Sequence, residues 1–584
     1  MCGILGVYSK KEINENLAEE LGCAAKIISH RGPDNTGCWK NENVVMFHNK
    51  LSILDFSSNS NQPIETENVI LTLNGEIYNY KDLIVKYGLN KNLIDAHILV
   101  FLYEKFGIEF LNYIEGDFAI SIYDKVKNKM FLCRDRLGVK PLLYTVVDDK
   151  IFYTSEIKAF YKISDISLKP DIKRIVDDFV LSFWAEKEHS YFENVFYVNP
   201  GEYLEIDKNL IKKKTYWDIN VNVKNSEKYF DEMKAELEDA TYRRTMGEAK
   251  YASLLSGGLD SSLLTAICAS KVDKLTSFTI KYEKEENNLD LEFAKSVVEK
   301  YPNINHKINF VKRDNITLPL LDKLTWHMEE ILWDKVYFSM WTNYHNARKN
   351  GYRIIINGQG SDEIWAGYYY DFEHYKYNKE KFYEIDEMYN LFYKTNVKYG
   401  KIFTEDSVDS VKNSLKKIAS SYITSDDTVN DICKWAAKTY LISNLMQEDR
   451  MSMAESVECR VPFTSYKFVE KAFEIKGEEK IKNNIEKFPV KQISYSYLPE
   501  KLANRRKQAF VNPSKTYNKI AQDYLKENWN AIATNTYFKQ IFNKEFLKTF
   551  INDKEMFEDG EFCWKLFALH RFFVVHERGG NINA

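Results

Sequence analysis

Cys2 is the first residue of this chain whose position suggests chemistry, because only Met1 precedes it. If Met1 is removed, Cys2 carries a nucleophilic thiol together with a free α-amine that can act as a base, which is the arrangement of N-terminal-nucleophile hydrolases. A bare Met-Cys start by itself favours a small buried hydrophobic residue in a first strand. Other motifs must therefore decide between the two interpretations.

Two further stretches could complete a thiol site. The sequence "HNKLSILD" (48–55) sets Lys50 before an expected strand, and "LNGEIYN" (73–79) sets Asn74 and Gly75 at an expected tight turn. An Asn side chain and a glycine N–H can form an oxyanion hole, in which one donor is worth about 10²–10³ in rate. Asn-Gly is also the most favoured hairpin turn, so taken alone the pair predicts only a turn.

The motifs "CGI", "HRGPD", "NGEIYN", "GDFA" and "RDRLGVKPL", in this order over residues 2 to about 160, resemble the class II glutamine amidotransferases. The resemblance implies that the N-terminal thiol cleaves the side-chain amide of glutamine to ammonia and a γ-glutamyl thioester, which water then releases as glutamate. It assigns Cys2 as the nucleophile, Asn74 and Gly75 as the oxyanion hole, and Glu76 and Asp95 as the groups that hold the α-amino end of glutamine.

The chain departs from this family at two positions. Lys50 stands where the family usually has an arginine for the α-carboxylate of glutamine, and a lysine keeps the charge but loses the bidentate fork. His97 stands two residues after Asp95, where a glutamate is usual. Both changes concern the affinity for glutamine rather than the chemistry of the thiol.

A second candidate site lies in "LLSGGLDSSLL" (254–264), which predicts a strand, a glycine-rich loop and a helix. Glycines let backbone N–H groups approach phosphate oxygens, and a helix N-terminus favours an anion. No Gly-Lys-Ser/Thr follows, so this is not a Walker A loop. Asp260 would repel phosphate unless Mg²⁺ lies between them. The three residues "SGG" alone are equally compatible with a phosphate-binding loop and with a generic strand-to-helix turn.

"SGGLDSS" resembles the pyrophosphate loop of ATP pyrophosphatases. Together with "INGQGSDEIWAGY" (356–368), "QEDRMSMAESVECRVPF" (447–463, expected as a helix that ends at Arg460) and "LPEKLANRRKQAF" (498–510), it resembles the synthetase domain of glutamine-hydrolysing asparagine synthetases. The implied ATP-binding residues are Leu255 and Ile280 beside adenine, Asn357 and Gly358 near the ribose or base, Ser256, Gly257, Gly258 and Ser261 on pyrophosphate, Asp260 and Asp362 on Mg²⁺, and Arg450 and Lys507 as neutralising charges. The alternative for Arg450 is a structural ion pair with a carboxylate on its own helix.

Gln359 is a third departure, because adenylating members of the family often carry Glu between the two glycines of this loop. Glu can position an acceptor or take a proton, whereas Gln can only form hydrogen bonds. Gln359 remains a candidate catalytic residue and leaves the identity of the acceptor acid open.

These sites need two kinds of scaffold. Short apolar runs separated by Gly, Asn and Asp fill the first two hundred residues, interrupted by helices expected near 13–29 and 95–106. From about 226 strands alternate with helices, which predicts a parallel α/β sheet, and from about 375 the chain is mostly helical. The resemblances imply an α/β fold class, with an N-terminal-nucleophile-hydrolase α/β/β/α sandwich over 1–218. A parallel sheet of the adenine-nucleotide α-hydrolase type with a helical C-terminal part should follow over 219–584.

The composition restricts partners and compartment. The formal net charge is −4, which gives no basic field for nucleic acid or membranes. Eight cysteines without a CxxC pair suit a reducing cytosol, and neither a signal peptide nor an apolar run of about 20 residues is expected. The sequence therefore predicts a cytoplasmic enzyme with small-molecule substrates, and a homodimer is one assembly that it leaves open.

Taken together, the resemblances imply that aspartate, glutamine and ATP are converted to asparagine, glutamate, AMP and pyrophosphate through β-aspartyl-AMP, with internal transfer of ammonia. The expected cofactors are ATP and Mg²⁺. Two alternatives stand beside this hypothesis: amidation of another carboxylate, such as a sugar uronic acid or a peptide, and a catalytically inactive glutamine-binding protein.

Overall fold

The computed structural model describes residues 2–181, 188–208, 210–224, 229–282, 289–368, 385–386, 389–390, 397–399, 401–422, 427–505 and 514–579. Met1 and Lys507 lie outside the described residues.

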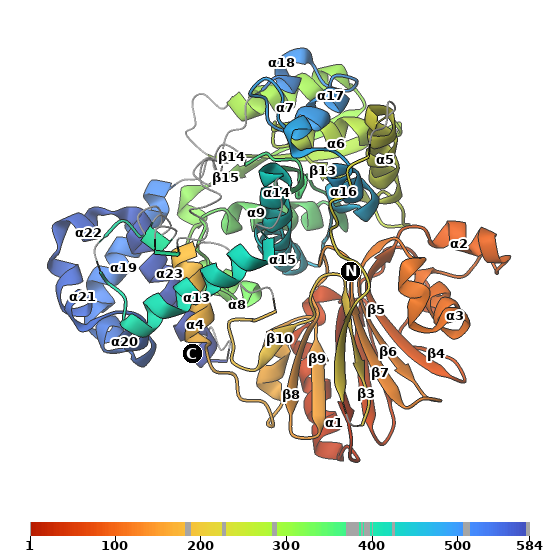
Figure 1. Cartoon of the computed structure of the whole chain (residues 1–584), viewed down its shortest axis with the longest axis horizontal. Helices are drawn as coiled ribbons and strands as arrows, with labels where there is room; N and C mark the ends of the chain where they lie inside the picture. The colour runs from red at the N-terminus through yellow and green to blue at the C-terminus, as the bar shows by residue number, and fades with distance from the viewer. Residues whose placement is uncertain are drawn as a thin grey trace.

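Two six-stranded antiparallel sheets form the N-terminal part of the chain (Figure 1). The first has the order β10-β8-β9-β1-β3-β2 and the second β12-β11-β7-β6-β5-β4. The strands of the first sheet are β1 (Gly3–Ser9), β2 (Asn35–Lys40), β3 (Val44–Lys50), β8 (Leu143–Val147), β9 (Lys150–Thr154) and β10 (Val195–Tyr197). Those of the second are β4 (Ile64–Glu65), β5 (Val69–Ile77), β6 (Gly116–Asp124), β7 (Lys129–Arg134), β11 (Glu202–Ile206) and β12 (Ile211–Thr215).

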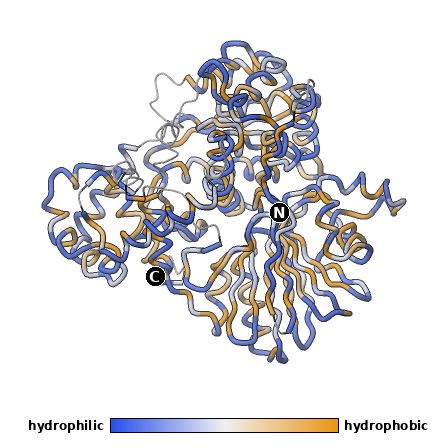
Figure 2. The backbone as a smooth tube through the Cα atoms, viewed as in Figure 1, coloured by the Kyte–Doolittle hydropathy of each residue, from blue (hydrophilic) through white to orange (hydrophobic). Residues whose placement is uncertain are grey.

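The alternation of side chains along each strand gives this part four layers. In β1, Ile4 and Tyr8 enter the core between the sheets, whereas Leu5 and Val7 face the other way and pack in the core that includes α1 (Glu15–Ile27). On the second sheet, the outward residues of β5 and β6 pack against α2 (Tyr80–Tyr87) and α3 (Asp95–Phe106). Hydrophobic segments run through both sheets in Figure 2. The predicted α/β/β/α sandwich is confirmed.

A five-stranded parallel sheet of order β15-β14-β13-β16-β17 follows. Its strands are β13 (Tyr251–Leu254), β14 (Leu275–Tyr282), β15 (Ile304–Val311), β16 (Ile354–Ile356) and β17 (Glu458–Arg460). The chain adds β14 and β15 on one side of β13 and then β16 and β17 on the other. The order therefore reverses between β13 and β16, and a crevice at the carboxyl ends of such strands is where open α/β sheets bind ligands.

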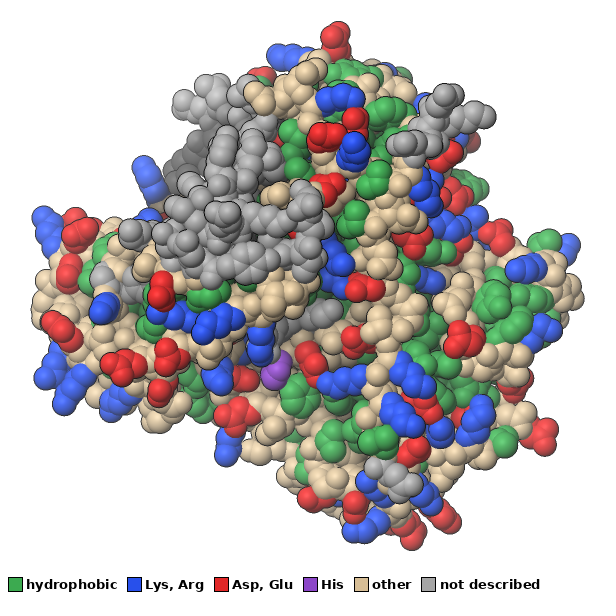
Figure 3. Space-filling view, viewed as in Figure 1, with side chains coloured by type: hydrophobic (Ala, Val, Ile, Leu, Met, Phe, Trp, Pro, Cys, Tyr) green, Lys and Arg blue, Asp and Glu red, His purple; other side chains and the backbone are tan. Residues whose placement is uncertain are grey.

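Helices surround this sheet and make up the C-terminal part, as Figure 1 shows. They are α5 (Tyr229–Arg243), α6 (Leu259–Ala269), α7 (Leu289–Lys300), α8 (Leu318–Met328), α9 (Tyr337–Lys349), α10 (Ser361–Ile364), α13 (Glu405–Tyr422), α14 (Thr428–Lys438), α15 (Tyr440–Met453), α16 (Tyr466–Phe473), α17 (Phe488–Ser494), α18 (Glu500–Ala503), α19 (Ser514–Thr534), α20 (Thr536–Ile541), α21 (Lys544–Thr549), α22 (Lys554–Glu558) and α23 (Gly560–Glu577). None of the described helices is both long and apolar enough to cross a membrane. The face drawn in Figure 3 carries acidic and basic side chains mixed together.

Helix α4 (Ile172–Leu181) connects the two parts, because it packs against α13 of the C-terminal part. The hydroxyl of Ser410 on α13 donates to Oδ1 of Asp177 on α4 at 3.0 Å. The last sandwich strand, β12, ends at Thr215, and α5 begins at Tyr229. The domain boundary predicted at 218 lies between these two elements.

Three local predictions were wrong. Asn74 and Gly75 lie inside the nine-residue strand β5 rather than at a turn, and Lys50 ends β3 instead of preceding a strand. The stretch 447–463 is not one helix to Arg460, because α15 ends at Met453 and residues 458–460 form β17. In each case pairing with a neighbouring strand decides the conformation, and short-range sequence signals do not report that pairing.

Candidate active sites

Cys2 lies at the start of β1, where its backbone is held by a strand of the other sheet. Its backbone N–H donates to the side-chain oxygen of Asn74 at 3.0 Å. The residue is buried, and burial raises the pKa of the Cys2 thiol above its usual value. A thiol in this state needs a nearby base before it can attack a carbonyl. Its own α-amine would be such a base once Met1 is removed.

Gly75 occupies a position in β5 that no other residue could take unchanged. Its φ is +141°, and a Cβ there would stand 2.0 Å from the carbonyl oxygen of Asp117 on β6. The glycine therefore allows close approach of two paired strands beside Cys2. This physical reason differs from the turn that the sequence suggested, although it places the residue at the predicted site.

A single pocket collects most of the residues predicted to bind glutamine. Its lining includes Cys2, Lys50, Gly75, Glu76 and Asp95. Cys2 directly precedes β1, and the others come from β3, β5 and α3, so the two sheets and one covering helix supply the walls together. The structure thus brings together residues that lie up to 93 positions apart in the sequence, from Cys2 to Asp95.

The pocket holds two buried acidic groups. Asp95 accepts N–H groups of Ile77 at 3.2 Å and Ala96 at 2.8 Å, and burial raises its pKa to about 6. Burial and neighbouring carboxylates also raise the pKa of Glu76, while Arg460 of the C-terminal part stands 3.6 Å away. A cationic α-amino group of glutamine would restore the charged form of both acids.

Lys50 is buried, and its ammonium is already positioned by two groups. It donates to the carbonyl oxygen of Ser57 at 2.7 Å and to the side-chain oxygen of Asn61 at 3.1 Å. Sequence reasoning missed His48, which also lines the pocket and contacts the carbonyl oxygen of Leu73 at 3.2 Å. Burial lowers the pKa of His48 to about 3, so its ring is neutral at pH 7.

The predicted pyrophosphate loop lies between β13 and α6, with Gly258 at the N-terminus of the helix. Gly257 has φ +82°, and a Cβ on it would stand 2.0 Å from the carbonyl oxygen of Asp290. The hydroxyls of Ser256 and Ser261 lie 2.8 Å apart across the loop. The loop therefore has the backbone freedom and the donors that a phosphate cradle requires.

The loop that follows β16 packs directly against this loop. A Cβ on Gly358 would stand 3.0 Å from the backbone nitrogen of Ser261 and 3.1 Å from Cβ of Asp260. Asn357 begins the loop, and its side-chain oxygen accepts the N–H of Gly358 at 2.6 Å. Leu255 and Ile280 stand at the carboxyl ends of the neighbouring strands β13 and β14. The described residues predicted for ATP thus lie at or near the carboxyl ends of β13, β14 and β16, with Arg450 set apart.

Asp260 and Asp362, predicted as Mg²⁺ ligands, are brought together by a lysine that sequence reasoning missed. The ammonium of Lys487 lies 2.6 Å from a carboxylate oxygen of each. These two negative charges raise the pKa of Lys487. The other oxygen of Asp260 is buried without a hydrogen-bond partner. Two carboxylates beside a predicted phosphate cradle, with one oxygen of Asp260 unpaired among the described residues, fit Mg²⁺, which binds one or two carboxylates plus phosphates. A third carboxylate, His or Cys does not join them among the described residues.

Arg505 is a second basic group that the motif search missed. Its guanidinium donates to the carbonyl oxygen of Gly257 at 2.6 Å and pairs with the carboxylate of Asp290. It thereby anchors the phosphate loop to α7. The predicted Lys507 lies two residues further, outside the described residues.

Arg450 points toward the N-terminal part of the chain. Its guanidinium donates to the carbonyl oxygen of Ser155 at 2.8 Å and pairs with Glu329 at 2.9 Å and Glu156 at 3.5 Å. It is almost fully buried. This placement favours the structural alternative, although the carboxylates come from other segments rather than from its own helix.

Strand β17 pairs with β16 at the edge of the parallel sheet and contacts the pocket of Cys2. Glu458 and Arg460 form an ion pair at 2.8 Å on the side of the glutamine pocket, where Arg460 also approaches Glu76. Arg460 further donates to the carbonyl oxygens of Arg244 and Met246. The positive charge of Arg460 lowers the pKa of Glu458 despite its burial.

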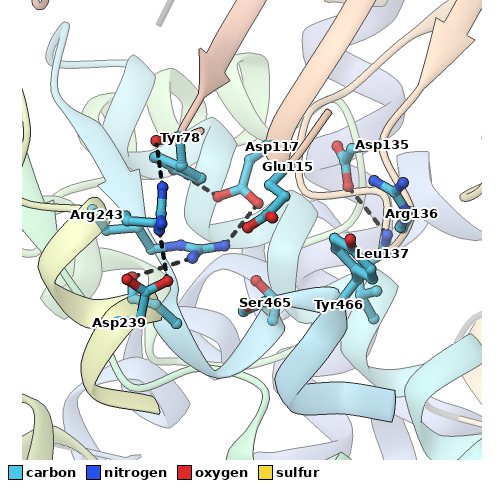
Figure 4. A pocket seen from close by; sticks show the side chains of 14 residues that line it. Tyr78, Glu115, Asp117, Asp135, Arg136, Leu137, Asp239, Arg243, Ser465 and Tyr466 are labelled. Carbon is cyan, nitrogen blue, oxygen red and sulfur yellow. Dashed lines mark hydrogen bonds and ion pairs between the residues drawn. The ribbon is translucent and has the colours of Figure 1, made fainter. Parts of the chain in front are cut away.

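A second cavity lies on the same boundary (Figure 4). Asp117 accepts hydrogen bonds from the hydroxyl of Tyr78 at 2.8 Å and from Arg244 at 3.1 Å, and Arg243 donates to Asp239 at 2.6 Å. Because these arginines already have carboxylate partners, we regard the cavity as a polar seam between the two parts.

Comparisons with known proteins match both halves of the chain. The family model described as "Asparagine synthase" matches residues 232–576, and the one described as "Glutamine amidotransferase domain" matches residues 1–217. A putative asparagine synthetase (glutamine-hydrolyzing) 2 of Methanocaldococcus jannaschii is 31% identical over 398 residues, which cover 63% of this chain and 76% of that protein. The asparagine synthetase (glutamine-hydrolyzing) 2 of Bacillus subtilis is 29% identical, with 80% of this chain and 66% of that protein covered. The asparagine synthetase (glutamine-hydrolyzing) 1 of the same organism is 25% identical, with 95% and 94% covered.

Proposed function

The chain belongs to the asparagine synthase family, and from this premise we propose that it converts aspartate, glutamine and ATP to asparagine, glutamate, AMP and pyrophosphate through β-aspartyl-AMP. Membership in the family makes it a glutamine-dependent ligase that uses ATP. The identity of the acceptor acid, the intermediate and the roles of single residues are the proposed part.

In the proposed first reaction, the thiol of Cys2 attacks the side-chain carbonyl carbon of glutamine while its own α-amine takes the thiol proton. The bond of Asn74 to the Cys2 nitrogen at 3.0 Å would orient that amine. Asn74 and Gly75 would stabilise the oxyanion. Ammonia leaves with the proton from the amine, and water then cleaves the thioester to glutamate.

In the proposed second reaction, the crevice at the reversal of strand order binds ATP. Ser256, Gly257, Gly258 and Ser261 would hold the pyrophosphate oxygens. Asp260 and Asp362 would hold Mg²⁺, which supplies positive charge where pyrophosphate departs. Lys487 would neutralise the same two carboxylates when the metal is absent, as its distances of 2.6 Å indicate.

The observation that carries the proposal is the position of β17. One described strand contributes Arg460 toward the proposed glutamine pocket, at 3.6 Å from Glu76, and pairs with β16, which is followed by the loop with Gln359 and by α10 with Asp362. Strand β17 thus contacts the pocket of Cys2 and adjoins the strand that leads to the predicted nucleotide loop. Such an arrangement is expected of an enzyme that transfers ammonia internally.

The test is an ATP–pyrophosphate exchange screen over carboxylic acids. Aspartate should support exchange, and with glutamine or ammonium it should yield asparagine. Exchange with another acid and none with aspartate would reject aspartate as the acceptor. Glutamate release from glutamine, measured with and without ATP, distinguishes an active enzyme from an inactive glutamine-binding protein.

A second candidate is amidation of a different carboxylate, such as a uronic acid or a peptide. The observation that favours it is Gln359, because an amide in this loop cannot act as a base and suits a bulkier acid as well as aspartate. The same exchange screen separates the two candidates.

The proposal extends to the organisation of the protein. The glutaminase domain would occupy residues 1–218 and the synthetase domain residues 219–584, with ATP and Mg²⁺ as cofactors. We further propose that the enzyme works in the cytoplasm, either alone or as a homodimer, without nucleic acid or membrane partners.

A further inference from the structure

The segment of residues 51–56, which we call the pocket wall, follows β3 and lies outside the described helices and strands. Its residues Leu51, Ser52, Ile53, Leu54 and Asp55 all line the pocket of Cys2. Contacts other than sheet pairing must therefore set the shape of this side of the pocket. Several of these contacts come from the C-terminal part of the chain.

Main-chain hydrogen bonds fasten the pocket wall to the residues that precede β13. The carbonyl oxygen of Ile53 accepts the N–H groups of Glu248 at 2.9 Å and of Ala249 at 3.1 Å. The carboxylate of Glu248 accepts the N–H of Phe56 at 3.2 Å. A Cβ on Gly247, whose φ is +130°, would stand 2.9 Å from the same carbonyl oxygen, so the close approach favours a glycine there. This stretch of the C-terminal part thus holds the later residues of the pocket wall.

Arg353 holds the beginning of the pocket wall. Its guanidinium donates to the carbonyl oxygen of Ser52 at 3.0 Å and forms two hydrogen bonds with the carboxylate of Asp34, one of them at 3.2 Å. Asp34 also accepts the N–H of Ser52 at 2.7 Å, so both backbone groups of Ser52 are bound. We call these three residues the Arg353 clamp. A planar guanidinium suits such a multiple contact better than the point charge of a lysine does.

The backbone of Arg353 is fixed by the parallel sheet. Arg353 directly precedes β16, and its N–H donates to the carbonyl oxygen of Lys250 at 3.1 Å. Its own carbonyl oxygen accepts the N–H of Glu458 at 2.7 Å. Lys250 precedes β13 and Glu458 begins β17, so neighbouring strands hold Arg353 on both sides. The guanidinium is therefore presented to the pocket wall by a rigid element, which suits a positioning role.

The Arg353 clamp also contacts the residue proposed to bind the α-carboxylate of glutamine. The N–H of Asp34 donates to the carbonyl oxygen of Lys50 at 3.0 Å. Lys50 lies two positions before Ser52 and lines the same pocket. A displacement of Asp34 and Ser52 would consequently move the backbone that carries the Lys50 ammonium.

We propose that Arg353 is a positioning residue for glutamine binding, through which the C-terminal part of the chain completes the pocket of the N-terminal part. The inference rests on the proposed assignment of this pocket to glutamine. Arg353 is not among the described residues that line the pocket, and it acts by fixing Ser52 and Asp34. Glutamine binding therefore depends on the contact between the two parts.

The test compares Arg353→Met with the wild type in glutamate release from glutamine without ATP. Loss of the clamp should raise KM for glutamine about 10-fold or more with a smaller change in kcat, because the pocket wall shifts while Cys2 is untouched. ATP–pyrophosphate exchange, measured with the acid that the wild type activates, should stay within about twofold of the wild type.

The matched control is Arg243→Met. Arg243 on α5 also joins the two parts, because it pairs with Asp82 on α2 at 2.6 Å. Its side chain is 25% exposed, close to the 20% of Arg353, but its partner lies outside the pocket wall. Arg243→Met should leave KM for glutamine unchanged. An equal rise of KM in the two variants, or an equal loss of exchange and glutamate release in Arg353→Met, would show a general loosening of the boundary and overturn the proposal.

Asp34→Asn tests the Arg353 clamp from the other side. The variant should also raise KM for glutamine, and its effect should not add to that of Arg353→Met in the double variant, because both substitutions disrupt the same contact. Fully additive effects would reject the clamp as one unit. Arg353→Lys keeps the charge but loses the fork, so its KM should lie between those of the wild type and Arg353→Met.

Arg353→Lys also provides the test if Arg353→Met does not fold, and a KM within about twofold of the wild type in both Arg353→Lys and Asp34→Asn would then reject the proposal. Failure of aspartate to support exchange would reject only the proposed acceptor, because glutamate release needs neither aspartate nor ATP. Absence of glutamate release from the wild type would reject the assignment of the pocket and this inference with it.

Discussion

The guanidinium of Arg31 forms two hydrogen bonds with the carboxylate of Asp449, at 2.7 and 3.1 Å, across the boundary between the sandwich and the synthetase part. The same side chain donates to the carbonyl oxygen of Cys2 at 3.1 Å and to Glu156 at 2.8 Å. One residue therefore links the backbone of the candidate nucleophile to α15.

Arg31→Met should lower stability strongly. The substitution leaves Asp449 and Glu156 buried without this cation, and breaking a buried ion pair in this way costs about 3–5 kcal/mol. The apparent midpoint of thermal unfolding should fall clearly below that of the wild type. Lys11→Met is the control, because the Lys11–Asp149 pair is exposed and should contribute little. Equal midpoints for the two variants would contradict the assigned role of Arg31.

Cys2→Ala should abolish synthesis from glutamine while preserving synthesis from ammonium salts. The reason is that the lining of the Cys2 pocket does not include Asp260 or Asp362, which meet at Lys487 instead. Product formation with each nitrogen source measures the effect. Intact mass of the wild type should show that Met1 has been removed. Retention of Met1 would exclude the α-amine as the base.

Lys50→Ala should raise KM for glutamine with a smaller effect on kcat. Loss of a charge-assisted hydrogen bond is worth about 1.5–3 kcal/mol, which corresponds to roughly a 10- to 150-fold increase in KM. Lys50→Arg tests whether the site has room for a guanidinium. The hydrogen bonds to Ser57 and Asn61 fix the position of the ammonium, and the larger arginine group must fit in the same place. A KM within about twofold of the wild type in Lys50→Ala would mean that Lys50 does not bind the carboxylate.

Asp260→Asn should remove most ATP–pyrophosphate exchange and leave ATP-independent glutamate release intact. The substitution takes one negative charge from the proposed Mg²⁺ site, whose other carboxylate is Asp362. Lys487→Met is the companion variant, because it leaves the two carboxylates without their cation. Mg²⁺ should therefore raise the unfolding midpoint of Lys487→Met more than that of the wild type. Equal shifts would argue against a shared metal site.

Glu448→Gln should become more stable relative to the wild type as pH rises. The folded-state pKa of Glu448, about 7, lies above its ordinary value of 4.5, so the folded protein binds this proton more tightly. Wild-type stability should consequently fall between pH 4.5 and 7, by up to about 3 kcal/mol from this group. Glutamine cannot titrate and avoids that loss. Unfolding midpoints at pH 5 and 8 measure the difference, and a constant difference would mean that Glu448 does not titrate in this range.

The sequence predicted well what depends on local pattern. Helices near 13–29 and 95–106 appear as α1 and α3, and the strand–glycine loop–helix at 254–264 appears as β13 and α6. Periodicity and glycine content suffice for such elements. The parallel sheet followed from the alternation of strands and helices, and the four-layer sandwich followed from the resemblance; the structure confirms both.

Residues defined by distant partners escaped prediction. Lys487 lies 227 positions from Asp260, and only the folded chain reveals that its ammonium meets both acids. Asn74 and Gly75 have the signature of a turn, yet pairing of β5 with β6 keeps them extended.

The charged contacts across the boundary also restrict how this kind of chain can evolve. Arg31 with Asp449, Arg460 with Glu76, and Arg450 with Glu156 each join a residue of the sandwich to one of the synthetase part. A glutaminase domain transplanted from another protein would leave any unmatched partner as a lone charge in a dry interface. Gene fusion or domain exchange would then yield an insoluble or unstable hybrid, so the two domains must be inherited together and change their contact residues in pairs.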